Sequence, residues 1–544
     1  MFVDLSVNLE PIEHDICVVG SGIIGLSIAH FLEANGLRVL MLEAGDRWPT
    51  DENIERNFGL LKVEDTHSPI EEASRRALGG NSYQWGGRCV PLDPIDLKER
   101  DWIPDSGWPI DYGELEKWHA AAAEFLRVKN SFEAADLFGD NALINFRDLE
   151  RWMPNSNVIE IYSEWLARSD SVQCILNAPV VGFEFDQEQR IVENVVVKSG
   201  PNQIPIKVNE LVIACGGVNT TRLLLNVQKQ SPHLFGGMNG PLGRYYMGHI
   251  YGKISTLKLT YASDFSKLNY TLDGDHYSRQ RISIAPETQE EFRLPQVTFT
   301  AGNPVVYDAA HKSGTFSMIW LALVSPIGHK FLTGPLRKIY VGEGSISIWP
   351  HIWNVVRRPF STIAGTLAVA KSMFFQKPRT PTIFVENKER AYALYYHAEQ
   401  TPLPENRISL SEQKDDLGMY RVAVTFECST REAERIVEAH KLLQKELEST
   451  GFGTLEFIDN DAACIASLLR QAKDGLHQIG STRMSLDPKD GVVNADCKIH
   501  DLDNAYIAST SVFPTSGQAN PTFAGVALAL RLGKHLIEKL RHKV

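Results

Sequence analysis

Residues 15–45 read DICVVGSGIIGLSIAHFLEANGLRVLMLEAG, and this stretch decides the fold of the first part of the chain. An apolar run ending at Val19 enters a glycine turn, and an amphipathic helix then continues to Asn35-Gly36. A second apolar run ends at Glu43. Two wholly apolar strands joined by a helix are typical of a parallel sheet covered on both faces, so we predict an α/β domain.

The glycines of this unit have the spacing of a dinucleotide-binding turn. Gly20 permits the tight turn, Gly22 lets a diphosphate approach the backbone, and Gly25 lets the helix pack closely on the strand. The start of the helix offers free N–H groups to the diphosphate. Glu43 stands where a carboxylate accepts hydrogen bonds from an adenosine ribose and repels a 2′-phosphate. The pattern disfavours NADP, and by itself it leaves both NAD and FAD open.

The composition is that of a globular protein with more than one domain. The chain has 544 residues, of which 43% are hydrophobic and 22% are charged. Its formal net charge of −12 gives nucleic acid no basic surface to bind, so a small-molecule ligand is expected. The seven cysteines are widely spaced and include no Cys-x-x-Cys pair, which argues against a disulfide framework and predicts no metal site. The chain shows neither a signal-peptide pattern nor an apolar run that could span a bilayer, so we expect a cytoplasmic protein.

Several later segments are predicted as strands of the same part of the molecule. Val172–Leu176, Val180–Phe185 and Ile191–Lys198 follow one another and predict a β-meander. Leu211–Ala214 is apolar and runs into Gly216-Gly217, as the first strand runs into its own glycines. We therefore expect a second strand–turn–helix element here.

The middle of the chain alternates apolar and polar residues, which is typical of an antiparallel sheet. The clearest alternating segments are His249–Leu259, Gln296–Thr300 and Thr315–Leu323. The end of the chain returns to a strand at Ala505–Ala508 and a helix at Phe523–Leu540. The two ends are therefore predicted to build one domain and the middle another.

Two further segments are predicted as helices. Residues 431–450 combine helical spacing of apolar residues with many charges, which predicts a surface helix. Residues 351–377 are apolar with four basic residues and have the composition of a segment that contacts a membrane or a partner subunit. In an acidic chain we expect instead a buried helix or a lid over the substrate cavity.

Three clusters carry residues suited to a ligand site. GGNSYQWGG at 79–87 brackets polar and aromatic residues with glycines, so its backbone is able to wrap a flat or anionic ligand. HQIGSTRM at 477–484 and PTSGQANPT at 514–522 are predicted loops, where functional side chains are common.

Together these blocks resemble the glucose-methanol-choline (GMC) oxidoreductases, flavoenzymes that oxidise alcohols. The resemblance also rests on LVIACGGVNTTRLLL at 211–225, LGRYYMGH at 242–249, AEQTPLPENRISLS at 398–411 and TSGQANPTFAGVALALRL at 515–532. The blocks occur in the family's order along nearly the whole chain. Their residues are most similar to those of the branch that contains pyranose oxidases, glycoside oxidases and sugar dehydrogenases.

The resemblance implies that the cofactor is FAD. Gln84 stands where fungal pyranose oxidases carry the histidine that attaches the flavin, so non-covalent FAD is implied. Ser509 stands where many members of the family carry an acidic residue. The residues that the resemblance places at the cofactor are Gly20, Gly22, Gly25, Glu43, Gly80, Asn81, Ser82, Trp85, Val180, Ala214, Ser509, Pro521 and Thr522.

The resemblance also implies that His477 and Asn520 are the catalytic pair. Oxidation of an alcohol needs a base for the hydroxyl proton while hydride leaves the carbon, and an imidazole suits this task. An amide then stabilises the developing alkoxide. The alternative roles are a helix cap or a polar pocket for His477, and the N-cap of the last helix for Asn520.

Three more residues of these blocks are interpreted as structural. His249 recurs in the family phrase but has no mechanistic role in this interpretation. Arg483 is expected to anchor its loop, and His397 is expected to be a sheet residue.

We therefore predict two domains. The first is a Rossmann-like FAD-binding domain assembled from residues 1–80, 172–250 and 478–544. The second is an α+β substrate-binding domain with a large, mainly antiparallel sheet, formed by residues 81–171 and 251–477.

The predicted function is oxidation of a hydroxyl group on a sugar or glycoside to the ketone or aldehyde, with hydride transfer to flavin N5. The electron acceptor is oxygen, a quinone or a partner protein, and homo-oligomers are left open. The alternatives are the catalytic subunit of a dehydrogenase, a non-redox flavin-fold lyase, and an NAD-dependent enzyme.

Overall fold

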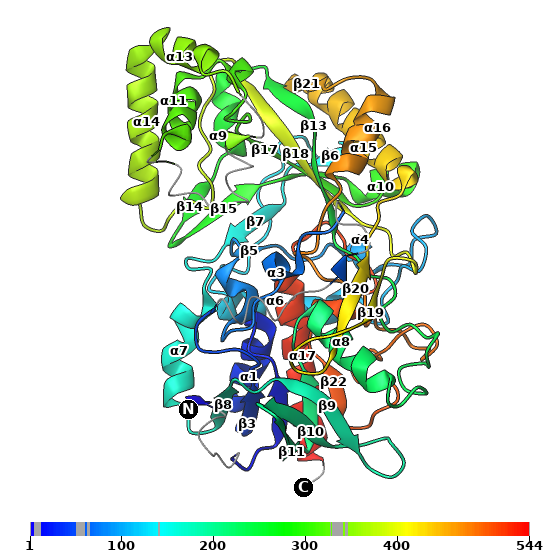
Figure 1. Ribbon diagram of the computed structural model, residues 1–544. Coiled ribbons are helices and arrows are strands. Elements are labelled where there is room, and N and C mark those ends of the chain that lie inside the picture. Colours follow the sequence, from blue (N-terminus) through cyan, green and yellow to red (C-terminus); the bar gives the residue numbers. More distant parts are fainter. Residues whose placement is uncertain are drawn as a thin grey trace.

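The computed structural model describes residues 2–4, 12–50, 60–61, 66–139, 142–326, 328, 341–342 and 346–542. Within these residues, six strands form a parallel sheet in the order β1-β8-β3-β2-β12-β22 in the lower half of the molecule (Figure 1). The predicted βαβ unit lies at its centre, and every residue of its two strands is buried. The elements are β1 (Phe2–Asp4), β2 (Ile16–Val19), α1 (Ile23–Ala34), β3 (Val39–Leu42), β8 (Val172–Leu176), β12 (Glu210–Ile213) and β22 (Ala505–Ile507).

The first and last helices of this half pack against each other. α17 (Thr522–Arg541) lies along α1, and glycines on α17 allow the close approach. A Cβ atom at Gly525 would lie 2.8 Å from Ile24, and one at Gly533 would lie 2.8 Å from Phe31. The two ends of the chain therefore share one core.

The predicted meander contains only two of the three predicted strands. β9 (Val180–Phe185) and β10 (Val192–Ser199) pair antiparallel, and the third strand is β11 (Asn202–Lys207). The prediction for Val172–Leu176 was wrong, because this segment is β8 of the parallel sheet. Every residue of β8 is buried, which suits a strand covered on both faces better than a solvated meander.

The upper half of the molecule contains the predicted large antiparallel sheet (Figure 1). Among the described residues it has six strands in the order β21-β13-β18-β17-β16-β6. α15 (Thr430–Ser449), which begins at a capping box formed by Ser429 and Glu432, packs on this sheet together with α16 (Asp461–Gln471). The strands are β6 (Ile144–Asn145), β13 (His249–Leu259), β16 (Ile282–Ile284), β17 (Val297–Gly302), β18 (Ala391–Glu399) and β21 (Gly453–Phe457). The predicted fold class is confirmed.

Smaller elements connect the two halves. One short sheet contains β5 (Arg88–Cys89), β7 (Leu149–Trp152), β14 (Thr271–Asp273) and β15 (His276–Gln280), and another contains β4 (Leu60–Leu61), β19 (Arg407–Lys414) and β20 (Tyr420–Thr425). The remaining short helices are α3 (Ile70–Ala73), η1 (Gly80–Tyr83), α4 (Pro94–Leu97), α5 (Tyr112–Glu116), α6 (His119–Phe125), η2 (Ala262–Asp264), α9 (Phe265–Leu268), α10 (Pro286–Phe292), η3 (Ala309–His311) and η5 (Thr510–Val512).

The predicted strand at Thr315–Leu323 is in fact part of a helix, α11 (Gly314–Val324). The hydroxyl of Ser313 accepts a hydrogen bond from the Phe316 N–H and caps the helix. The buried side chains include Phe316 and Trp320, four residues apart, so the burial follows the period of a helix and not that of a strand.

Most of residues 351–377 are helical, but they form neither a wholly buried helix nor a wall of the cavity at the carboxyl ends of the parallel strands. They form most of α13 (Trp349–Val356) and all of α14 (Pro359–Phe374), which stand at the upper left corner of Figure 1. Many of their large apolar side chains face solvent, and neither helix lines the cavity at the carboxyl ends of the parallel strands. In the described part of the chain, no helix has both the length and the apolar character needed to cross a membrane.

The packing bears on the proposed division into domains, which stays a prediction. α5 and α6 pack against α17, and α7 (Val158–Arg168) packs against β8. These helices belong to the residues that the sequence analysis placed in the substrate-binding domain, yet their buried side chains join the core of the parallel sheet.

Gly25 gives a direct test of this packing. A Cβ atom there would lie 2.1 Å from the carbonyl oxygen of Gly20, so Gly25→Ala must push α1 away from the turn. We expect Gly25→Ala to lower the free energy of unfolding by about 3 kcal/mol, since overpacking against backbone has no easy relief. Gly182→Ala is the matched control, because nothing lies within 4 Å of a Cβ at Gly182. Urea titration followed by circular dichroism measures both, and equal stability of the two variants would contradict the close packing.

Candidate active site

A cavity of about 490 Å³ lies at the carboxyl ends of the parallel strands. Gly20, Glu43 and Ala214 directly follow β2, β3 and β12, so the sheet itself brings them to one edge. Of the predicted site residues, only Gly25 and Ser82 do not line the cavity. The predicted residues that do line it are Gly20, Gly22, Glu43, Gly80, Asn81, Trp85, Val180, Ala214, His477, Ser509, Asn520, Pro521 and Thr522.

The glycine turn has the geometry expected of a diphosphate cradle. Gly20 has a φ of +105°, and a Cβ atom there would lie 2.5 Å from the carbonyl oxygen of Ala214. In contrast, nothing lies within 4 Å of a Cβ at Gly22, which borders the cavity at the start of α1. The backbone is therefore open to a ligand at Gly22, next to the N-terminal end of the helix.

Glu43 is buried at the wall of the cavity. Its Oε2 accepts hydrogen bonds from the Ser21 N–H at 3.1 Å and the Ser21 hydroxyl at 2.5 Å, and its Oε1 accepts one from the Gly45 N–H at 2.8 Å. Burial raises the pKa of Glu43, and these hydrogen bonds oppose the shift. The carboxylate is thus held in one position, where its remaining lone pairs are available to ribose hydroxyls.

The second glycine loop lies directly against the first. The Gly79 N–H donates to the Ser21 carbonyl at 3.0 Å, and a Cβ atom at Gly80 would lie 3.1 Å from the Cα atom of Gly22. Asn81 donates to the Ala73 carbonyl at 2.6 Å, and the Trp85 indole donates to the Ser156 carbonyl at 2.6 Å. Asn81 and Trp85 therefore fix the loop along the cavity wall.

Buried polar atoms without a partner indicate that a polar ligand fits between these loops. Ser82 Oγ, Arg88 Nη2 and Asn520 Oδ1 are buried and make no hydrogen bond to protein. Arg88 and Asn520 line the cavity. Such atoms are costly unless a ligand or water satisfies them. Arg88 Nη2 is a donor that suits a phosphate or ring carbonyl oxygen, and Asn520 Oδ1 is an acceptor that suits a hydroxyl or N–H group. The sequence analysis did not identify Arg88, because an arginine that follows a glycine loop has no local signature.

His477 and Asn520 meet at the cavity. The amide nitrogen Nδ2 of Asn520 lies 3.1 Å from Nε2 of His477. Because an amide N–H group only donates, Nε2 accepts this hydrogen bond and carries the lone pair of the imidazole. α17 begins after Pro521, and no side chain caps it, so the alternative role of Asn520 as an N-cap is not observed.

Two groups that the sequence analysis did not predict as catalytic lie behind His477. Its Nδ1 lies 2.9 Å from Nδ1 of His249 and 3.3 Å from Oδ2 of Asp474. Met247 and Ile479 exchange two backbone hydrogen bonds, which bring the start of β13 next to the segment that carries His477. His249 was interpreted as structural, but it contacts the proposed base directly.

Asp474 acts as a buried anchor for this segment. Its Oδ1 accepts hydrogen bonds from the N–H groups of Gly475, Leu476 and His477, and its Oδ2 accepts one from the His249 N–H at 2.7 Å. Burial raises the pKa of Asp474, but the charge and hydrogen bond of His477, with His249, outweigh burial and hold it well below its ordinary value. An Asp-Gly step three residues before a histidine is a turn signal that could have revealed this residue.

His397 completes a group of three imidazoles. Its ring stacks on that of His249 at 4.3 Å, and its Nδ1 lies 2.6 Å from the Gln518 carbonyl oxygen. Burial, with His397 and His477, lowers the pKa of His249 well below its ordinary value, and burial with Arg88 does the same for His397. The ligating nitrogens of the three rings lie within 4.8 Å of one another, a separation that a metal ion could bridge. The expectation of no metal site stays a prediction.

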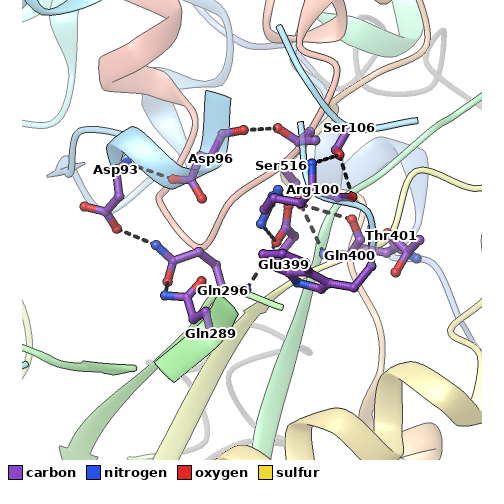
Figure 2. Close-up of polar contacts among 12 residues, drawn as sticks. Asp93, Asp96, Arg100, Ser106, Gln289, Gln296, Glu399, Gln400, Thr401 and Ser516 are labelled. Carbon is purple, nitrogen blue, oxygen red and sulfur yellow. Dashed lines mark hydrogen bonds and ion pairs between the residues drawn. The ribbon is translucent and has the colours of Figure 1, made fainter. Parts of the chain in front are cut away.

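A buried network holds the loop that carries Asn520 (Figure 2). Arg100 makes two hydrogen bonds to Glu399, at 2.8 and 2.6 Å. Next to Glu399 on the chain, the Gln400 N–H donates to the Ser516 hydroxyl at 3.1 Å, and Thr515 donates to the Asp96 carbonyl at 2.7 Å. The loop is therefore tied both to β18 and to α4.

Comparisons with known proteins found two family models that match parts of this chain. The model of the FAD dependent oxidoreductase family matches residues 15–237, and that of the GMC oxidoreductase family matches residues 402–529. The fructose dehydrogenase large subunit of Gluconobacter japonicus is 22% identical over 98% of this chain and 99% of its own length. The C-glycoside 3-oxidase of Microbacterium trichothecenolyticum is 35% identical over 12% of this chain and 13% of its own.

Solved structures share the fold. Pyridoxine 4-oxidase from Mesorbium loti has a TM-score of 0.51 at 15% identity and covers 96% of this chain and 99% of its own. A fungal aryl-alcohol oxidase has a TM-score of 0.52 at 13% identity and covers 98% and 100%. The comparisons confirm the resemblance drawn from the sequence.

The Arg100–Glu399 pair gives a stability prediction. Both side chains are almost fully excluded from water, so Glu399→Gln leaves the guanidinium without its counterion. We expect the free energy of unfolding to fall by about 3–5 kcal/mol. Arg293–Asp101 is an exposed ion pair of the same chemistry, and Asp101→Asn should cost less than about 1 kcal/mol. Thermal unfolding of both variants measures the two losses of stability. A similar loss of stability in each variant would refute a special role for the buried pair.

Asp474 gives a pH prediction. Its pKa is lower in the folded protein than in the unfolded chain, so the ionised carboxylate stabilises the fold above the unfolded value of about 3.9. This stabilisation is lost as the pH falls through that region towards the folded pKa. Asp474→Asn should therefore cost about 1–3 kcal/mol at neutral pH, and the difference from the unsubstituted protein should shrink below about pH 4. Denaturant titrations across this pH range measure the free energy of unfolding of both proteins. A difference that widens towards low pH would contradict a lowered pKa for Asp474.

Proposed function

Because this chain is a GMC-type, FAD-dependent oxidoreductase that acts on CH–OH groups, we propose that it oxidises a hydroxyl group of a sugar or glycoside to the ketone or aldehyde. The observation that carries the proposal is the pair of His477 Nε2 and the Asn520 amide, 3.1 Å apart on the wall of a cavity at the carboxyl edge of the parallel sheet. The names of the fructose dehydrogenase and C-glycoside 3-oxidase relatives support a sugar as substrate.

The proposed cofactor contacts follow the two glycine loops. Gly20 and Gly22 would accommodate the diphosphate, Gly25 allows α1 to pack closely on that turn, and Glu43 would accept hydrogen bonds from the ribose hydroxyls. Gly80, Asn81 and Trp85, from the loop that also contains Ser82, would lie along the flavin. The backbone of Val180 would meet the adenine, and Ala214, Ser509, Pro521 and Thr522 line the same cavity. Gln84 lines the cavity with an amide that forms no bond to a flavin carbon, which supports non-covalent FAD. When bound, FAD supplies the acceptor for the hydride that leaves the substrate carbon.

The side chains of the site are arranged to accept the proton of a substrate hydroxyl. A substrate hydroxyl enters between His477 and Asn520, so that its oxygen accepts the Asn520 N–H and its proton passes to Nε2 of His477. The proton already on Nδ1 faces Asp474, whose carboxylate stabilises the imidazolium that forms. Because His249 and His397 have lowered pKa values, they stay neutral and add no charge that opposes this step.

A second candidate is the catalytic subunit of a dehydrogenase, which passes its electrons to a partner protein or quinone. It is favoured by the relative named as a large subunit, whose whole length matches this chain.

A cytoplasmic location remains the expectation from the sequence.

An anaerobic panel of sugars and glycosides tests the proposed reaction, because loss of the flavin absorbance requires transfer of hydride from the substrate. Reduction by at least one sugar and no reduction by matched deoxy sugars is the expected result. Re-oxidation on admitting air separates an oxidase from a dehydrogenase. A flavin that stays oxidised with every alcohol would favour the non-redox alternative.

His477→Ala and Asn520→Ala should each retain FAD and reduce the rate of flavin reduction by about 10²–10⁴-fold, because general-base help and alkoxide stabilisation are lost. Stopped-flow absorbance measures the rate per bound flavin. His233→Ala changes an exposed histidine and serves as the control. Loss of FAD from the His477 variant with an unchanged rate per remaining flavin would show that the residue binds the cofactor and does not act as the base.

A further inference from the structure

α13 and α14 each present large apolar side chains to solvent. The exposed residues on α13 are Trp349, Trp353 and Val356, and those on α14 are Phe360, Ile363 and Leu367. Trp349 is 72% exposed and Phe360 is 88% exposed, values that are unusual for such large apolar side chains. These six residues are here called the α13–α14 face, and the two helices that carry them stand at the upper left of the molecule (Figure 1). A cluster of this size marks a surface that binds something.

The opposite sides of the two helices are firmly packed, so the face is not an unfinished core. His351 of α13 stacks on Trp320 of α11 at 4.0 Å and lies 3.1 Å from the Ser317 hydroxyl. Gly365 of α14 lies so close to α11 that a Cβ atom there would be 2.3 Å from Thr315 Oγ1. The contact with α11 therefore fixes both helices with their apolar side outward.

The charge around this face differs from that of the rest of the chain. Residues 346–385 contain five Lys and Arg and no Asp or Glu, whereas the whole chain has a net charge of −12. Arg357 and Arg358 lie between the two helices, and Lys371, Lys377 and Arg379 lie at the far end of α14. Arg358 pairs with Glu389 at 3.3 Å. The apolar side chains are thus accompanied by cations at the connection between the helices and at the end of α14.

This combination points to one occupant. A second copy of the chain is disfavoured, because a two-fold contact through the face would set the same cations against each other. A lipid surface matches every feature: tryptophans and basic side chains are enriched where protein meets headgroups, and helices with an apolar face and basic borders lie in that layer. We propose that the α13–α14 face docks on an anionic phospholipid surface, with the apolar side chains in the headgroup layer and the cations on lipid phosphates.

The test uses the FAD-loaded full chain and vesicles of phosphatidylcholine, with or without roughly one-third phosphatidylglycerol. Co-sedimentation should show binding to the anionic vesicles that is about tenfold weaker on neutral vesicles, and raising the salt from about 0.05 M to about 0.5 M should release the protein. Binding that ignores both lipid charge and salt would overturn the electrostatic part of the proposal. Absence of binding to either kind of vesicle would overturn the proposal as a whole.

Two sets of variants link binding to this face. Trp353→Ser with Phe360→Ser should lower binding about tenfold or more, as should Lys371→Gln with Lys377→Gln, while the rate of flavin reduction in solution stays unchanged. Leu486→Ser removes an apolar side chain that is 77% exposed elsewhere and should leave binding unchanged. Equal binding by all variants would place the lipid contact elsewhere and refute the assignment. A dimer that disappears in the Trp353 and Phe360 variant, without vesicle binding, would replace the lipid surface by a second copy as the occupant.

Discussion

The guanidinium of Arg100 and the carboxylate of Glu399 meet inside the protein, where water has almost no access to either. Glu399 ends β18, and in the antiparallel register it stands opposite His249 of β13. The next residue, Gln400, binds the loop that leads to Asn520. One ion pair therefore fixes the strand ends from which both the histidine cluster and its amide partner are positioned. Burial of two charges is costly, and it is tolerated here because each has its hydrogen-bond partner.

The proposed base takes its orientation from groups that are distant in sequence. Asn520 contacts one ring nitrogen of His477, while His249 and Asp474 lie at the other. Only Asp474 is local, and it holds the turn through the backbone N–H groups that follow it. Positioned polar groups of this kind need no rearrangement when a proton moves, which is how a site gains rate without strong binding of substrate.

The sequence alone predicted the local structure correctly where a pattern of residues is compatible with only one backbone conformation. The turn at Gly20 and Gly25 and the carboxylate at Glu43 are of this kind, because each glycine is required by a backbone atom that would otherwise collide. Local patterns failed where burial depends on the other half of the chain. Thr315–Leu323 alternates like a strand, yet α13 and α14 pack on it as a helix. The role of His249 beside His477 could not be predicted either, because it depends on backbone pairing between residues more than two hundred positions apart.

The contact between α1 and α17 has a consequence for how the chain is made. β2 and β3 are synthesised well before β22 and α17, which complete their sheet and cover α1. Until then the nascent polypeptide holds apolar strands without their final cover, which is the situation that chaperones protect. The parallel sheet is therefore completed only once β22 and α17 have been synthesised, long after its central βαβ unit has left the ribosome.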